Sequence, residues 1–265
     1  LGEGVTNLEL GQRVGMWTFG DRGCYSEYVC TAADRAVPVP DGLGAVEAAA
    51  LVTNYLTARV AGHEIARVNS GERILVHGAA GGVGSALVQL GVLDGLEIYG
   101  TASAHNHDLV RSLGATPIDY RTEDFVKRIR ELTGDGVDVV FDVIGGGLQL
   151  WRSSRALRKG GRLLMLGMHS AVKSGIWKVP GSMLAVASVA LLPNGKTAPM
   201  GPGMGKYPAE NMDWYRDSLA GFFELAVTGK MKPVIAKQFP LLEAVQAHEF
   251  MERGGRAGKV VLTVE

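Results

Sequence analysis

Apolar positions follow two different spacings along this chain, and the spacing changes near residue 46. Before that point, short apolar runs are separated by Gly and Pro, a pattern that indicates short strands and turns. After residue 72, short apolar runs alternate with segments whose apolar positions recur every three or four residues. Short continuous apolar runs are typical of buried strands, and apolar positions that recur every three or four residues are typical of amphipathic helices. Their alternation predicts an α/β fold with a doubly wound parallel sheet.

The predicted elements follow from these spacings. The expected strands of the parallel sheet cover residues 73–78, 96–102, 118–120, 137–144 and 162–166. The expected helices cover residues 46–61, 84–93, 108–113, 123–132, 148–157, 212–227 and 243–252. Short strands are expected at 12–16, 25–31 and 36–39, and a closing strand at 259–264.

Composition excludes several classes of protein. The 265 residues carry 27 basic and 27 acidic side chains, so no broad positive field favours nucleic acid or anionic lipid. The apolar run 183–192 has ten residues, about half of the roughly 20 that a membrane span needs. The N-terminus lacks the pattern of a signal peptide. Two cysteines make no disulfide framework, which favours a reducing, cytoplasmic location.

The segment 77–84, His-Gly-Ala-Ala-Gly-Gly-Val-Gly, lies between a predicted strand and a predicted helix. Backbone N–H groups at the start of a helix, together with the helix dipole, attract a pyrophosphate. Gly81 would let the backbone approach the phosphates, and Gly84 would let the helix pack closely on the strand. Ala79 stands where the usual G-x-G-x-x-G pattern has its first glycine. The strand and helix on either side support a dinucleotide site; a structural turn without a ligand is the alternative.

The end of the second predicted strand distinguishes NADP from NAD. An acidic residue there would bind the ribose 2′-hydroxyl and repel a 2′-phosphate. Glu97 lies at the wrong end of the strand, and the next acidic residue is Asp108. Ser103 can donate a hydrogen bond to a phosphate, and His105 can add positive charge. NADP(H) is therefore the predicted cofactor; the alternative is that Ser103, His105 and His107 form only a polar turn.

Several sequence blocks, in this order, resemble the medium-chain dehydrogenase/reductase superfamily. More narrowly, they resemble its zinc-independent quinone oxidoreductase branch, which is related to zeta-crystallin. The blocks are GEGV at 2–5, GQRV at 11–14, NYLTA at 54–58, AGGVG at 80–84, TAS at 101–103, RSLGA at 111–115, IDYR at 118–121, GKMKP at 229–233 and GKVVL at 258–262. The resemblance covers essentially the whole chain.

The resemblance implies a domain organisation. Residues 46–232 are expected to form a Rossmann domain that binds NADP(H). Residues 1–45, with 233–265 returning to them, are expected to form part of a GroES-like β domain. Family members begin with a further N-terminal part of that catalytic domain, whereas this chain begins with Leu1 in strand-like sequence. We therefore expect an upstream segment to be missing.

The resemblance also implies a cofactor site at the carboxyl ends of the strands, where open parallel sheets bind ligands. Its expected pyrophosphate residues are Ala80, Gly81, Gly82 and Val83. Ser103 and His105 are expected at the 2′-phosphate and Tyr120 beside the adenine. The remaining expected cofactor residues are Asn54, Thr57, Ile144, Gly145, Leu166, Gly167, Met168 and Lys259. For Tyr120 and Met168, ordinary packing is an equal alternative.

The predicted activity is that of an NADPH:quinone oxidoreductase-like enzyme, in which hydride passes to a quinone or another electron-poor carbonyl or enone. Asn54 is the candidate catalytic residue, as a hydrogen-bond donor to the acceptor carbonyl. No metal is expected, because Thr53 stands where the zinc-dependent branch has a cysteine and no Cys-x-x-Cys occurs. The alternatives are a 2-alkenal or enoyl reductase and a noncatalytic, redox-sensing NADPH-binding protein.

The predicted partners are few. A small-molecule acceptor is expected, and neither a membrane nor nucleic acid is. The apolar run 183–192 follows the fifth strand and is expected to add a sixth. In the family that edge commonly pairs with its twin, so a homodimer through this strand is predicted.

Overall fold

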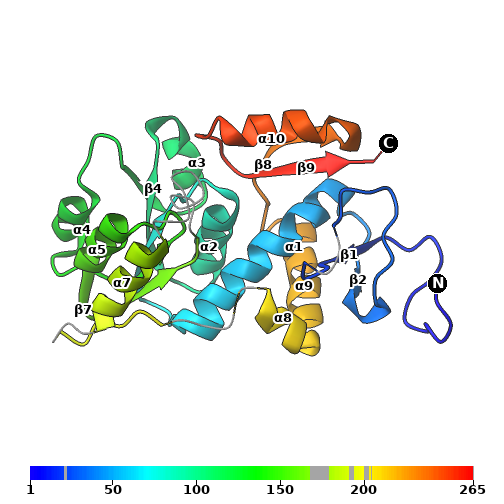
Figure 1. Cartoon of the computed structure of the whole chain (residues 1–265), viewed down its shortest axis with the longest axis horizontal. Coiled ribbons are helices and arrows are strands. Elements are labelled where there is room, and N and C mark those ends of the chain that lie inside the picture. The colour runs from blue at the N-terminus through cyan, green and yellow to red at the C-terminus, as the bar shows by residue number, and fades with distance from the viewer. Residues whose placement is uncertain (21–22, 168–178, 191–193, 200–202, 204, 265) are drawn as a thin grey trace. The chain divides into compact units, whose positions relative to one another are not determined.

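The computed structural model describes residues 1–20, 23–167, 179–190, 194–199, 203 and 205–264 (Figure 1). The chain forms two compact units: residues 1–57 with 202–265, and residues 58–201. The sequence predicted domain boundaries after residues 45 and 232 instead. The predicted division separates a cofactor-binding domain from a catalytic domain, and it stays a prediction.

The second unit is built on a five-stranded parallel sheet, which confirms the predicted doubly wound α/β fold. The strands lie in the order β5-β4-β3-β6-β7. They are β3 (Arg73–His77), β4 (Glu97–Ala102), β5 (Thr116–Asp119), β6 (Val137–Asp142) and β7 (Leu157–Met165). The chain winds outward from β3 through β4 to β5, and then returns to the other side of β3 with β6. The switch point of the sheet therefore lies between β3 and β6.

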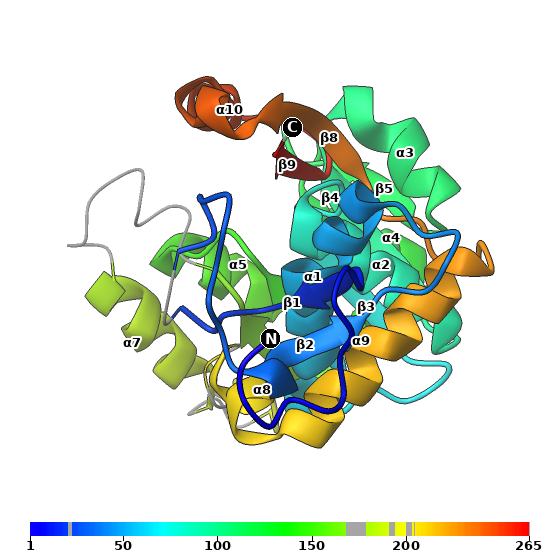
Figure 2. The same cartoon turned by 90° about the vertical axis from the view of Figure 1, so that its right-hand side faces the viewer.

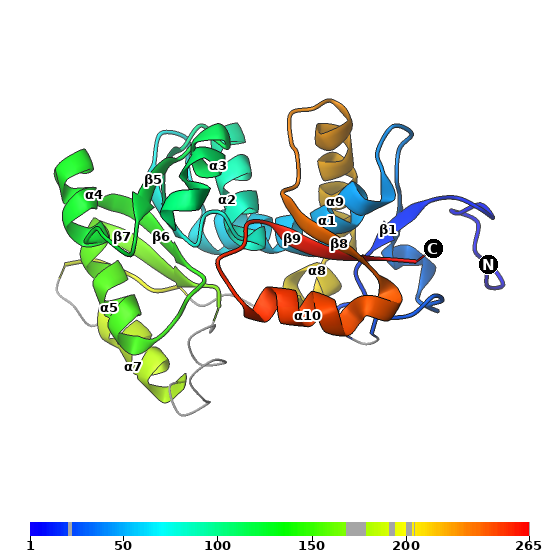
Figure 3. The same cartoon turned by 90° about the horizontal axis from the view of Figure 1, so that it is seen from above.

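Helices cover both faces of this sheet, in separate layers (Figure 3). One layer holds α2 (Gly82–Leu93) and α3 (His107–Ser112), and the other holds α4 (Phe125–Thr133), α5 (Gly147–Ala156) and α7 (Val179–Ala190). Short turns complete the unit: the π-helical η2 (Val60–Ala66) and the 3-10 helix η3 (Ala104–Asn106). Right-handed crossovers place the helices this way when the strand order reverses.

Neighbouring residues of each strand serve the two layers in turn. Leu75 and Tyr99 belong to the core cluster that contains Phe125 of α4 and Leu150 of α5. Ile74 points to the other face, where its side chain lies 3.5 Å from the position of a Cβ built on Gly91 of α2. Successive strand residues face opposite sides of a sheet, so a fully apolar strand supports both helix layers.

The first unit contains two small sheets. In one, β1 (Val14–Met16) pairs antiparallel with β2 (Ala36–Pro38); in the other, β8 (Ile235–Pro240) pairs parallel with β9 (Lys259–Thr263). α10 (Ala244–Glu252) connects β8 to β9 and lies beside them (Figures 1 and 2). The remaining elements are η1 (Ala33–Arg35), α1 (Ala45–Arg59), α8 (Lys206–Glu210), α9 (Met212–Val227) and η5 (Leu241–Glu243). The last two residues of α1 count with the second unit.

A buried tyrosine fastens α9 to the strand pair β1–β2. The Tyr215 hydroxyl donates to the Arg35 carbonyl at 2.8 Å and accepts from the Trp17 N–H at 2.9 Å. Burial raises the pKa of Tyr215 to about 12, so the phenol stays protonated. The fully buried side chain of Phe222 packs on the ring of Tyr55, with 5.8 Å between the ring centroids. These contacts place α9 in the first unit.

Two predicted strands are wrong. The segment predicted as a sixth strand over 183–192 lies in α7 as far as residue 190, and 191–192 fall outside the described residues. Ser182, Val186 and Val189 are buried there while Leu184 is 72% exposed, a helical spacing against α5. A short apolar run does not distinguish strand from helix by itself. A dimer through a strand at this place is not retained; the homodimer stays a prediction without an assigned interface.

The second wrong strand is that expected over 25–31. These residues pair with no other strand in the described part of the chain, and Tyr28 is 90% exposed. A strand exists only where a neighbour accepts its backbone hydrogen bonds. Separately, among the described residues no helix combines the length and apolar character that a membrane crossing requires.

Candidate functional site

The glycine-rich turn between β3 and α2 has the geometry of a phosphate cradle. Gly78 adopts a φ of +66°, and the Gly81 N–H closes the turn on the Gly78 carbonyl at 2.9 Å. A Cβ on Gly84 would overlap the Gly78 carbonyl oxygen. The absence of a side chain at position 84 therefore lets the first turn of α2 press directly on the glycine turn.

The first turn of α2 supplies the donors. α2 begins at Gly82 with Gly81 as its N-cap, and no acidic side chain lies in its first turn. The N–H groups that open a helix have no acceptor within the helix, and the dipole makes this end positive. Ala80 is buried beneath the turn, while Gly81, Gly82 and Val83 are partly accessible. These N–H groups support the predicted role of the turn in holding a pyrophosphate, which stays a prediction.

The structure explains why Ala79 is tolerated in place of the usual first glycine. The Ala79 N–H donates to the Thr101 carbonyl at 3.0 Å, which fixes the turn against the end of β4. A Cβ on Gly100 would lie 2.5 Å from the Cβ of Ala79. The glycine that the close contact requires is Gly100 on the neighbouring strand, and the Ala79 methyl fills the space beside it.

Beyond β4, a serine, a tyrosine and an arginine lie together. Ser103 is buried and donates from Oγ to the Tyr120 hydroxyl at 3.3 Å. Tyr120, which follows β5, is 53% exposed, and the Arg121 guanidinium lies 5.7 Å from its ring centroid. The hydrogen bond from Ser103 lowers the pKa of Tyr120, and Arg121 lowers it further. The exposed imidazole of His105 lies on η3, close in sequence to Ser103.

Arg121 is a further candidate for the cofactor site that was not among the residues predicted from sequence. Sequence reasoning chose His105 as the source of positive charge because that residue follows the second strand. The signal for Arg121 was present in the pairing of strands: β5 runs parallel beside β4, so their carboxyl ends reach the same edge of the sheet. A guanidinium there is charged at every physiological pH, unlike an imidazole.

The loop after β6 is fixed by the last residue of the strand. One carboxylate oxygen of Asp142, Oδ1, accepts from the N–H groups of Ile144 and Gly145, at 2.9 Å each. Asp142 is fully buried, and Gly145 has a φ of +71°, a conformation that favours glycine. The predicted cofactor residues Ile144 and Gly145 are therefore held in one backbone conformation.

The loops after β6 and β7 and the glycine turn lie side by side. The Leu166 N–H donates to the Asp142 carbonyl at 2.8 Å, and a Cβ on Gly167 would overlap the Val143 carbonyl. On the opposite side, a Cβ on Gly78 would lie 3.1 Å from the Val143 side chain. The structure thus brings the strand-end residues predicted from sequence together on both sides of the switch point.

A buried polar chain joins the glycine turn to the β6 loop. The Gly78 N–H donates to Thr101 Oγ1 at 3.2 Å, and Thr101 Oγ1 lies 3.0 Å from His77 Nδ1. His77 Nε2 lies 3.0 Å from Ser153 Oγ, which donates to Asp142 Oδ2 at 2.8 Å. The four side chains are all buried. The sequence analysis assigned no role to His77, Ser153 or Asp142.

The directions of these hydrogen bonds define the tautomer of His77. The Ser153 hydroxyl donates its one hydrogen to Asp142, so its oxygen accepts from the Nε2–H of His77. Nδ1 then carries no proton and accepts from Thr101. Burial lowers the pKa of His77, opposed by the charge of Asp142 and reinforced by Arg152. The chain of hydrogen bonds is complete with a neutral imidazole and with Asp142 as the final acceptor.

Three predicted site residues belong to the first unit, and a fourth falls outside the described part of the chain. Asn54 and Thr57 are both buried on α1, three residues apart, in the first unit. Lys259 opens β9 in the same unit, where burial lowers the pKa of its ammonium group. The part of these three in cofactor binding stays a prediction. Met168 lies outside the described residues.

The described residues do not fit a zinc ion. Among them, no three His, Cys, Asp or Glu side chains gather into a set that could hold a metal. Cys24 and Cys30 are both exposed and form no disulfide. Zinc sites in proteins are built from three or four such ligands. No step of the chemistry below is assigned to a metal.

The sequence matches the family model described as "Zinc-binding dehydrogenase" over residues 113–262. It is also 31% identical over 272 residues to the "Synaptic vesicle membrane protein VAT-1 homolog" of Danio rerio. That match covers 100% of this chain and 55% of the relative, so the chain spans about half the length of that protein.

Two solved structures are similar in fold. The quinone oxidoreductase of Pseudomonas syringae pv. Tomato DC3000 superposes with a TM-score of 0.83 at 29% identity, covering 99% of this chain and 78% of the other. The JamJ enoyl reductase, in its apo form, superposes with a TM-score of 0.82 at 26% identity, covering 100% and 76%.

Proposed function

The chain belongs to the zinc-binding dehydrogenase family of the medium-chain dehydrogenase/reductase superfamily, and from that premise we propose that it transfers hydride from NADPH to a quinone. Other electron-poor carbonyls and enones belong to the same acceptor class. Membership of this family supports an oxidoreductase activity. The choice of NADPH and of acceptor is our proposal.

One observation carries the proposal: a glycine-rich turn opens α2 beside the switch point of the sheet. Gly81, Gly82 and Val83 would hold the pyrophosphate through backbone N–H groups. The loop at Ile144 and Gly145 borders the turn on the other side of the switch point, where open α/β sheets bind their ligands. A nicotinamide dinucleotide is the ligand class that such a turn suits.

NADP is favoured over NAD by the residues at the end of β4. Among the described residues, no acidic side chain follows β4 before Asp108, and the Glu97 carboxylate, at the start of the strand, accepts from the Tyr99 hydroxyl. Asp119, which ends β5 opposite Ala102, accepts from the Arg121 N–H. Ser103 offers a hydroxyl and Arg121 a permanent positive charge at the neighbouring strand ends. These groups suit a 2′-phosphate, for which a guanidinium is the strongest protein partner.

The protein's own part in the reaction is to bind and orient. When bound, NADPH supplies the hydride. The buried chain from Gly78 through His77 to Asp142 holds the glycine turn and the β6 loop in fixed positions, which preorganises the site. A quinone acceptor takes its proton from water, so no strong acid is required of the protein. Asn54 would donate a hydrogen bond to the acceptor carbonyl, and Asn54→Ala is expected to lower turnover.

The proposal is tested by titrating the chain separately with NADPH and NADH while nicotinamide fluorescence is followed. 1,4-Benzoquinone is then added and the absorbance of the reduced nicotinamide is recorded. Tighter binding of NADPH than of NADH, followed by quinone-dependent oxidation, is the expected result. NADH binding as tight as NADPH would contradict the choice of cofactor. Tight binding without oxidation by any acceptor would instead support a noncatalytic, redox-sensing role.

An enoyl reductase is the second candidate, because the JamJ enoyl reductase superposes nearly as well as the bacterial quinone oxidoreductase. The two activities differ in the acceptor. An enoyl reductase would oxidise NADPH with a conjugated enone or thioester and only weakly with benzoquinone. Parallel assays with both acceptors distinguish the two proposals directly.

A further inference from the structure

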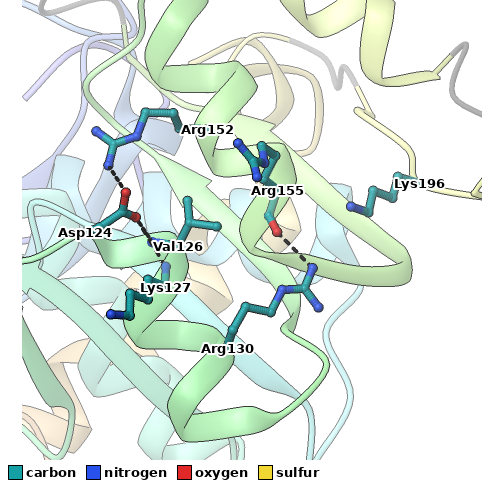
Figure 4. A pocket seen from close by; sticks show the side chains of 7 residues that line it. All are labelled: Asp124, Val126, Lys127, Arg130, Arg152, Arg155 and Lys196. Carbon is teal, nitrogen blue, oxygen red and sulfur yellow. Dashed lines mark hydrogen bonds and ion pairs between the residues drawn. The ribbon is translucent and has the colours of Figure 1, made fainter.

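A strongly cationic pocket of about 560 Å³ lies between α4 and α5 in the second unit (Figure 4). Its charged lining consists of Lys127, Arg130, Arg152, Arg155 and Lys196, with Asp124 as the one carboxylate. None of these residues belongs to the glycine turn or to the strand-end loops of the proposed cofactor site. The pocket is therefore a second place where charge gathers on the same unit.

Two of the five cations are already compensated. Arg152 lies 3.3 Å from the Asp124 carboxylate and 4.7 Å from the centroid of the Phe125 ring. Lys127 lies 3.9 Å from the carboxylate of Glu131, one turn further along α4. These pairs neutralise their charges locally, so they do not by themselves call for a ligand.

The other three cations, Arg130, Arg155 and Lys196, pair with no carboxylate within the part of the chain that the structure describes. Arg130 donates to the carbonyls of Arg155 at 2.9 Å and Leu157 at 3.1 Å, and Lys196 donates to the Ser154 carbonyl at 2.8 Å. Carbonyl acceptors hold a cation in place without cancelling its charge.

The effect of this excess charge is visible on Lys196. Partial burial lowers the pKa of its ammonium group, and the positive charge of Arg130 lowers it further. Like charges destabilise one another, and an anion between them would remove that repulsion. Arg155, in contrast, is exposed and lies with its guanidinium 5.0 Å from the centroid of the Trp151 ring.

We propose that this pocket binds a small polyanion that carries two or more phosphate groups. Its volume lies in the range of small-molecule sites, and its three uncompensated cations come from two helices and the segment around Lys196 (Figure 4). Guanidinium groups bind phosphate oxygens in pairs, which favours phosphate over a monovalent anion. The chain as a whole has zero net charge, so a compact ligand suits this local cluster better than a nucleic-acid duplex.

Isothermal titration calorimetry with inorganic tripolyphosphate at low ionic strength tests the proposal, with and without saturating NADPH. The double variant Arg155→Gln/Lys196→Gln removes two of the uncompensated cations and should weaken binding by roughly 25-fold, about fivefold for each charge. Arg155→Lys keeps the charge and should retain most of the affinity. Arg128→Gln is the matched control: it removes one charge from α4 outside the pocket, where Glu123 and Glu131 already pair with it.

The expected pattern is binding that falls with added salt, persists with NADPH bound and is weakened in the double variant but not in the control. Tripolyphosphate should also raise the pKa of Lys196, followed by NMR of its side chain. The proposal is overturned if wild-type protein binds no tripolyphosphate, or if Arg128→Gln weakens binding as much as the double variant. Competition by NADPH would place the anion in the glycine turn instead. Tighter binding of a DNA duplex would replace a small polyanion with nucleic acid.

Discussion

The second unit contains two proposed phosphate sites, one built from backbone and the other from side chains. At the carboxyl edge of the sheet, the glycine turn presents N–H groups whose positions depend on the absence of side chains and on a buried polar chain. Between α4 and α5, the pocket presents arginine and lysine side chains on already formed helices. The first site should be sensitive to added atoms and the second to removed charges. The following predictions test that difference.

The largest effect is expected from adding a side chain at Gly84. Gly84→Val places a Cβ where the Gly78 carbonyl oxygen lies, so backbone must move. We expect a loss of about 3 kcal/mol in the free energy of unfolding, the upper end for overpacking, together with loss of NADPH binding. Urea denaturation and fluorescence titration measure the two.

Gly221→Ala is the control for that substitution. Gly221 lies inside α9, and a Cβ there meets nothing within 4 Å. Alanine should stabilise the helix by about 0.5–1 kcal/mol. If Gly84→Val were tolerated as well as Gly221→Ala, the close approach of α2 to the glycine turn would be disproved.

Breaking the buried polar chain should come next in size. Ser153→Ala leaves the Nε2–H of His77 without an acceptor and one oxygen of Asp142 without a donor, both in buried surroundings. We expect a loss of about 2 kcal/mol of stability, and weaker NADPH binding because the β6 loop is less well fixed. Chemical denaturation and a binding titration report the two effects.

The neighbouring serine is the matched control. Ser154 is also buried, but its hydroxyl donates only to the Trp151 carbonyl of the same helix, at 2.7 Å. Ser154→Ala should therefore cost less than about 0.5 kcal/mol, since that carbonyl belongs to an exposed residue of the helix. Equal losses for the two variants would mean that the chain from His77 to Asp142 contributes nothing specific.

The pH dependence of stability follows from His77. Burial lowers its pKa in the folded protein, whereas in the unfolded chain the imidazole titrates near pH 6.5. Its contribution is therefore complete above that value and is lost as the pH falls, by up to about 1.4 kcal/mol per pH unit. Denaturation of wild-type and His77→Asn protein at about pH 7.5 and about pH 5.5 measures it. A slope that is unchanged by the substitution would refute the assignment.

The smallest effect is expected from Arg121. It is a charged side chain at the site that is otherwise built from backbone N–H groups, so it tests whether a removed charge matters there too. Arg121→Gln should weaken NADPH binding by roughly fivefold, the size expected for one exposed charge, and leave NADH binding unchanged. Arg111→Gln, which removes an exposed cation paired with Asp108 on α3, is the control. Equal weakening of NADPH and NADH would argue against a 2′-phosphate beside Arg121.

Much of the fold could be predicted because it depends on local pattern. The strands 73–78 and 137–144 are continuous apolar runs, and the structure has β3 at Arg73–His77 and β6 at Val137–Asp142. The helix expected over 212–227 is α9. The short run at 183–192 was ambiguous, because its apolar residues satisfy a strand or a helix until a packing partner is known. Contact with α5 made it a helix.

The residues of the candidate site also fall into those that the sequence predicted and those that it did not. Gly81 and Gly84 could be found from sequence, since they stand within one turn between a strand and a helix. Arg121 was missed because it reaches the end of β4 only through the pairing of β4 with β5. His77, Ser153 and Asp142 were missed for a similar reason: His77 and Ser153 are 76 positions apart, and they meet only because β3 lies beside β6 and α5 packs on the sheet.

Local sequence pattern was enough to predict the strands of the parallel sheet, most of the helices and the glycine-rich turn that opens α2. Periodicity and glycine act over a few residues, so they need no partner to be recognised. Only the tertiary structure decided which polar groups meet. The neutral tautomer of His77, the hydrogen bond from Ser103 to Tyr120 and the gathering of Arg130, Arg155 and Lys196 all depend on distances between elements. Electrostatic and hydrogen-bond energies depend on those distances and on burial. Local sequence specifies neither the distances between elements nor the burial of a side chain.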